Sequence, residues 1–100
     1  MDLNKFGKRA YNNALSRGKI HNDLADIYVV HEETVVSMTE EMNEVVVASE
    51  TLPGDHLPQY TEIVEELVDV AIAAITELHR RGVDIEEVLH AKMKYNESRT

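Results

Sequence analysis

Residues 51–58 separate two long helical patterns and so limit how this chain can fold. Two Pro, one Gly and one Asp within this segment predict a loop. Apolar side chains recur at three- and four-residue steps over residues 23–50, and again from residue 58 or 59 to residue 81. Two long helices joined by a short loop favour antiparallel packing of the pair.

Two shorter helices are predicted outside this pair. Residues 2–17 have helical apolar spacing and end before Gly18, a helix stop. A fourth helix begins near Ile85, where Asp84 and Glu87 resemble a capping box. The pattern predicts an all-α four-helix bundle, with residues 1–100 as a single domain. Asn22 or Asp23 is the predicted cap of the second helix, and Gly82 ends the third. The fourth helix is expected to pack through Ile85, Val88, Leu89 and Met93.

The second helix has apolar side chains on two sides. Its main stripe, which we expect to pack against a neighbouring helix, places Glu41 and Glu44 at its edge. A carboxylate at such an edge is partly buried and still reaches a cavity. The opposite stripe, Val29, Val36 and Val47, predicts a second neighbour and hence a homodimer or homotetramer. The main stripe consists of Ile27, Tyr28, His31, Val35, Met38, Met42 and Val45.

The net charge of the chain limits the classes of molecule that it can bind. The formal net charge is −9 and the pI is about 4.9, so polymeric nucleic acid is a poor partner. No Cys is present, which excludes disulfides and thiolate metal sites and fits a cytoplasmic protein. No signal peptide and no apolar run of membrane-spanning length is evident, so no membrane is expected as a partner.

Two pairs of acids point to a metal. Glu41 and Glu44 are three residues apart, and so are Glu66 and Asp69, which places each pair on one helix face. If the helices pack antiparallel, four carboxylates meet, and their repulsion favours a hard cation such as Mg²⁺, with Mn²⁺ as a substitute. The alternative is that these acids are solvated, as charges on outer helix faces commonly are.

Two strings that contain these acids, and a third near the C-terminus, resemble the motifs of the MazG-like, all-α nucleoside triphosphate pyrophosphohydrolases. The strings occur in the order typical of that family, and the resemblance covers residues 14–100. They are Glu40-Glu41-Met42-Asn43-Glu44, Glu65-Glu66-Leu67-Val68-Asp69-Val70-Ala71 and Lys92-Met93-Lys94-Tyr95-Asn96-x-x-Arg99.

The resemblance implies an enzyme that hydrolyses a (d)NTP between the α and β phosphates, giving the monophosphate and pyrophosphate. It implies that the two acid pairs are the catalytic metal ligands, and that a bound metal lowers the pKa of an attacking water. It also implies phosphate contacts from the C-terminal string. The implied ligands are Glu41, Glu44, Glu66 and Asp69, and the implied phosphate-binding residues are Lys92, Asn96 and Arg99.

The role of Glu40 is open. It either hydrogen-bonds to the metal ligands, activates a water molecule, or faces solvent. Its side chain points about 100° away from the face of Glu41 and Glu44, which favours solvent. The resemblance does not identify the base or the sugar. Residues of the first two helices in the region of a base pocket are more often caps, core or surface residues; they are Asn12, Asn13, His21, Asp23, Tyr28 and His31.

Other functions remain alternatives. A non-enzymatic interaction or regulatory bundle would have solvated acids and no turnover. A di-iron bundle needs a Glu-x-x-His on each of two helices, and this chain offers only Glu87-x-x-His90. Within the family, a dUTP-specific or phosphoribosyl-ATP pyrophosphohydrolase would keep the acids and change the pocket.

Overall fold

Residues 1–21 and 26–99 are described by a computed structural model, and the described part is helical without a strand. This confirms the predicted all-α class and the four helices. No helix in this part of the chain is long and apolar enough to cross a bilayer. The helices are α1 (Leu3–Ser16), α2 (Ile27–Val47), α3 (Glu62–Arg80) and α4 (Ile85–Ser98).

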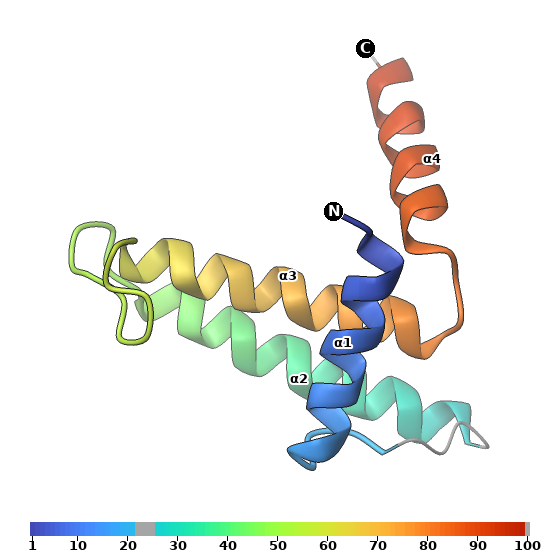
Figure 1. Ribbon diagram of the computed structural model, residues 1–100, viewed down its shortest axis with the longest axis horizontal. Helices are drawn as coiled ribbons and strands as arrows, with labels where there is room; N and C mark the ends of the chain where they lie inside the picture. The colour runs from blue at the N-terminus through green and yellow to red at the C-terminus, as the bar shows by residue number, and fades with distance from the viewer. Residues whose placement is uncertain (22–25, 100) are drawn as a thin grey trace.

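Helix α3 is the centre of the arrangement (Figure 1). Helix α2 runs antiparallel beside it, and α1 crosses its C-terminal half. Helix α4 starts at the same end and extends away, in contact with α1 and α3 but not with α2. At this junction Gly7 is buried, and a Cβ on it would lie 2.5 Å from the Ile85 side chain, so a larger residue there would force the buried Ile85 to shift.

Most helix ends follow local rules. The Asp2 carboxylate accepts from the backbone N–H groups of Asn4 and Lys5, and Asp84 accepts from Glu87 N–H. Gly18 and Gly82 have φ of 71° and 74°, as expected for helix stops. The described cap of α2 is Asp26, which accepts from Tyr28 N–H, whereas the predicted caps Asn22 and Asp23 lie outside the described residues.

The loop between α2 and α3 is longer than predicted. Helix α2 ends at Val47 rather than residue 50, and α3 begins at Glu62 rather than residue 58 or 59. Backbone bonds from Gly54 N–H to Tyr60 O and from Glu62 N–H to Leu52 O close this loop across several residues. These hydrogen bonds pair backbone groups that would otherwise be paired within a helix. Both helices are therefore shorter at the loop than the apolar spacing predicts.

The predicted main stripe of α2 is wrong as a packing surface within one chain. Most of it is exposed, with Tyr28 83% accessible, and only Met38 and Val45 are half-buried. Helix α2 instead turns Val30, Thr34 and Glu41 toward α3. The predicted packing of α4 is confirmed for Ile85, which is fully buried. It is wrong for Val88, Leu89 and Met93, because the helix extends away from the other three.

A polar network explains why α2 turns this face inward. The Arg80 side chain is fully buried and pairs with Glu33 of α2 and with Glu77, at 3.4 Å. The Glu77 carboxylate also accepts from Thr34 Oγ1 at 2.7 Å and pairs with Arg81 at 3.0 Å. Burial opposes ionisation of Glu33, but hydrogen bonds from Arg80 and His21 outweigh it and lower the pKa of Glu33. A buried charge is tolerated only when it is paired, so this network sets the facing sides of α2 and α3.

Candidate functional site

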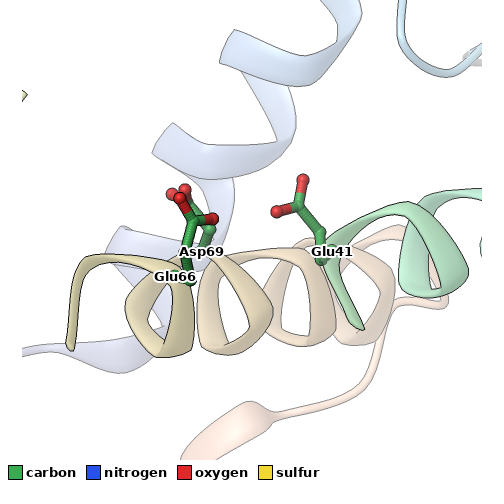
Figure 2. Close-up of side chains that lie close together, drawn as sticks. All are labelled: Glu41, Glu66 and Asp69. Atoms are coloured by element: carbon green, nitrogen blue, oxygen red, sulfur yellow. The ribbon is translucent and has the colours of Figure 1, made fainter. Parts of the chain in front are cut away.

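Three acidic side chains meet between α2 and α3. Oxygen atoms of Glu41, Glu66 and Asp69 all lie within 4.8 Å of one another. Figure 2 shows Glu66 and Asp69 side by side on α3, with the Glu41 carboxylate extending from α2 on the same side. The i, i+3 step on α3 and the antiparallel pairing with α2 together produce this cluster. The sequence predicted that four acids converge, and Glu44 is not among these three.

The cluster is electrostatically unfavourable without a cation. Burial and the neighbouring Asp69, Glu44, Glu65 and Glu41 raise the pKa of Glu66. Burial, then Glu41 and Glu65, raise the pKa of Asp69, and this is partly offset by Lys19 and His56. Two raised carboxyl pKa values from α3, beside a third acid from α2, are typical of a site that binds positive charge.

The cluster lies in an open depression of about 380 Å³. This volume is within the range of small-ligand sites, roughly 300–1,000 Å³. Glu44 and Glu40 line it as well, so the structure places both predicted acid pairs and Glu40 around one space. Glu40 is exposed and also borders a second hollow, which Lys19 lines as well. The other lining residues are Asp55, His56 and Glu65.

Glu65 builds the rim of this depression. Its buried carboxylate accepts from the backbone N–H groups of His56 and Leu57 at 2.9 and 2.7 Å, which holds the loop against α3. A Cβ on Gly54 would lie 3.1 Å from the Glu65 oxygen, so the loop passes close to this carboxylate. Glu65 therefore places Asp55 and His56 beside the acids. The sequence motif contains Glu65 but does not indicate this role.

Lys19 is the residue that the sequence reasoning missed. Its ammonium lies 3.4 Å from Glu41 Oε1, although no motif includes it. A Lys just after a helix-stop Gly was the only available signal, and it is weak because such lysines commonly cap helix C-termini. The fold places this lysine beside the acids.

A smaller cavity adjoins the acidic cluster. It measures about 80 Å³, and Glu41 and Asp69 line both spaces. Of the residues considered for a base pocket, Asn13 lines this cavity, and Asn12, Tyr28 and His31 are exposed. His21 pairs with Glu33, and Asp23 lies outside the described residues.

The C-terminal string lies apart from the acids. Lys92 and Asn96 are exposed on α4, and the exposed Arg99 follows its last residue. Helix α4 starts at the opposite end of α3 from the loop (Figure 1). The Lys92 ammonium and the Arg99 guanidinium both lie over the Tyr95 ring. Within one chain, the structure therefore does not bring these three residues to the carboxylates. Glu87 and His90 of the di-iron alternative are exposed on the same helix.

The acidic residues fit magnesium. Its oxygen ligands lie at about 2.0–2.1 Å in an octahedron, so adjacent ligands are about 2.9 Å apart and opposite ligands about 4.2 Å apart. Oxygen atoms within 4.8 Å of one another would draw closer together around a bound ion. The depression is open to solvent, which leaves room for water and phosphate oxygens in the remaining positions.

No protein-family model, curated protein or solved structure matches this chain.

Proposed function

We propose that this protein is a Mg²⁺-dependent pyrophosphohydrolase that converts a (d)NTP to the monophosphate and pyrophosphate. The supporting observation is the convergence of Glu41, Glu66 and Asp69 oxygens within 4.8 Å, from the two helices that carry the resembling motifs. Glu44, which lines the same depression, is the proposed fourth ligand. A dUTP-specific or phosphoribosyl-ATP enzyme is included in this proposal, because either would use the same acids.

A bound magnesium ion would supply positive charge to phosphate oxygens and polarise an attacking water. The part of the chain is to hold four carboxylates around one space and to keep that space open to a ligand. The Arg80 network fixes α2 against α3, and Glu65 fixes the rim. Preorganised ligands of this kind avoid the cost of gathering like charges during the reaction.

The active form in this proposal is a homodimer or homotetramer. The buried apolar residues of the described chain are Ile20, Val30 and Ile85, which is a small core for a 100-residue domain. Leu67 and Val68 of α3 are exposed, and so are Val88 and Met93 of α4. A second copy would cover these faces. Helix α4 does not contact α2 of the same chain. In an oligomer, Lys92, Asn96 and Arg99 of one copy would contact phosphates bound at the acids of another copy.

The decisive measurement is product identity. The protein is incubated with Mg²⁺ and a panel of NTPs and dNTPs, and monophosphate plus pyrophosphate are resolved from diphosphate plus phosphate. We expect the first pair of products, and a loss of at least about 100-fold in Glu41→Gln and Asp69→Asn, since removing one charge-stabilising group typically costs that much. Glu50→Gln is the control, because Glu50 is an exposed acid outside the depression.

Two results would contradict the proposal. Wild-type turnover in Glu41→Gln or Asp69→Asn would refute the ligand assignment. No turnover of any nucleotide, with Mg²⁺ or Mn²⁺ and with phosphoribosyl-ATP included in the panel, would favour the non-enzymatic helical protein.

A further inference from the structure

We propose that Lys19 is a phosphate-binding residue of the acidic site and that it releases Glu41 when a divalent cation binds. This inference rests on the proposed function. It adds a residue from the connection between α1 and α2, 22 positions before its partner in the chain. Lys19 has a fixed backbone and a mobile side chain, lies beside an excess of negative charge, and borders the small cavity that adjoins the depression.

The backbone of Lys19 is held in place on both sides. Gly18, at φ 71°, donates its N–H to Leu15 O, and Lys19 donates its N–H to Ala14 O, each at 3.0 Å. This is the Schellman arrangement, which turns the chain sharply at the end of α1. The next residue, Ile20, is buried. The turn and the buried neighbour therefore direct Lys19 toward α2.

The side chain of Lys19 has room to move. It is 32% accessible, whereas the Glu41 side chain is 16% accessible. A lysine has a flexible four-carbon stem and a compact charge, so it can pair with one anion and then with another at small cost. An ion pair at 3.4 Å with one exposed partner is weak enough to be exchanged.

Charge explains why such a residue is needed. Seven of the eight residues that line the depression are acids. A triphosphate brings several more negative charges, and one divalent cation adds only two positive charges. Lys92 of the same chain lies on α4, away from α2, and Arg99 follows that helix. Lys19 is already within reach of the cluster, and its charge partly offsets the raised pKa of Asp69.

The position of Lys19 also suits a phosphate. Lys19 lines the small cavity that shares Glu41 and Asp69 with the depression, and Arg17 lines the same cavity. A cation at Glu41 would repel the ammonium from its present partner. A phosphate oxygen on that cation would offer the ammonium a new anion within the site, so the lysine would change partners without leaving it.

The test compares two ligands with opposite expected responses. Mn²⁺ alone is titrated by electron paramagnetic resonance, and inorganic pyrophosphate is titrated by calorimetry in the presence of Mn²⁺. In Lys19→Met we expect Mn²⁺ alone to bind about threefold more tightly, because a weak competing charge is gone. We expect pyrophosphate to bind about tenfold or more weakly, because a charged hydrogen bond is lost.

Two further variants complete the test. Lys19→Arg keeps the charge and should hold pyrophosphate within about threefold of wild type. Lys8→Met removes an exposed lysine of α1 and should change neither affinity. Circular dichroism of each variant verifies that helix content is unchanged.

The outcomes separate this inference from the proposed function. If the wild type binds Mn²⁺ but Lys19→Met matches it for both ligands, the role of Lys19 is refuted and the metal site stands. Equal weakening of both ligands in Lys19→Met would show a structural role and would also refute it. If the wild type does not bind Mn²⁺, the metal site itself fails, and the role of Lys19 fails with it.

Discussion

Glu65 and Glu66 are consecutive on α3 but serve different parts of the molecule. The buried Glu65 carboxylate accepts two backbone N–H groups of the loop, at 2.9 and 2.7 Å. Glu66 joins Glu41 and Asp69 in the acidic cluster, where burial and like charges raise its pKa. Adjacent helix positions point about 100° apart, so one glutamate can build the rim while its neighbour faces the site.

This difference predicts opposite effects for two matched variants. Glu65→Ala should lower the free energy of unfolding by about 1–3 kcal/mol, because two loop N–H groups lose their acceptor. It should also expose residues 50–61 to protease. Glu66→Ala should leave stability unchanged or raised, and should abolish Mn²⁺ binding. Urea unfolding, limited proteolysis and Mn²⁺ titration of both proteins check this, and equal stability losses in the two would contradict it.

Asp69 predicts a specific pH dependence of stability in the metal-free protein. Its pKa is raised in the folded state, so its contribution to stability is present below its unfolded pKa and is lost as pH rises through the folded pKa. Asp69→Asn removes this loss. We expect the variant to have a higher Tm than wild type at pH 7, and the difference to shrink as pH falls toward the ordinary carboxyl range.

The control for this experiment is the metal. Saturating Mg²⁺ at pH 7 should raise the Tm of the wild type and leave Asp69→Asn nearly unchanged, since only the folded wild type binds the ion. A Tm difference between the two proteins that is independent of pH would show that Asp69 is not electrostatically strained. The pKa values of Glu33 and Asp84 are lowered in the folded state, so both proteins lose stability in acid through these two groups. This loss is the same in the wild type and the variant and does not affect the difference in Tm.

Arg80 should be the most sensitive position for stability. Its fully buried guanidinium pairs with Glu33 and Glu77 and donates to His21 O. Arg80→Met leaves these acids without that partner and should cost about 3–5 kcal/mol. The neighbouring Arg81→Met is the matched control, because Arg81 is exposed and its pairing is worth less. Urea midpoints measure both, and equal costs would contradict the assignment.

Leu67 tests the proposed association of copies. Its exposed side chain lies on the same face of α3 as those of Val64 and Val68, which are also exposed. Leu67→Glu should shift a dimer or tetramer toward monomer at micromolar concentration, measured by light scattering. Val83→Glu, at an exposed apolar residue between α3 and α4, should leave the assembly intact. A monomeric wild type would contradict the proposal.

Local chemistry made much of this protein predictable. Helix stops at Gly18 and Gly82 need only a positive φ, and the Asp84 cap needs only a neighbouring helix start. The acidic pair on α3 follows from helical spacing, and its meeting with Glu41 follows from antiparallel pairing with α2. Glu44 follows the same rule, and the structure places it in the same depression.

Long-range interactions decided the rest. Apolar spacing selected Tyr28, Val35 and Met42 as the packed face of α2, but the buried Arg80 network outweighs apolar burial and turns another face inward. The sequence by itself determined the helices and the acids within them, because caps and helical period act over a few residues. Only the tertiary structure placed Lys19 beside Glu41 and the loop against Glu65. Each contact joins residues from different parts of the chain, so the helical period of one segment does not predict it.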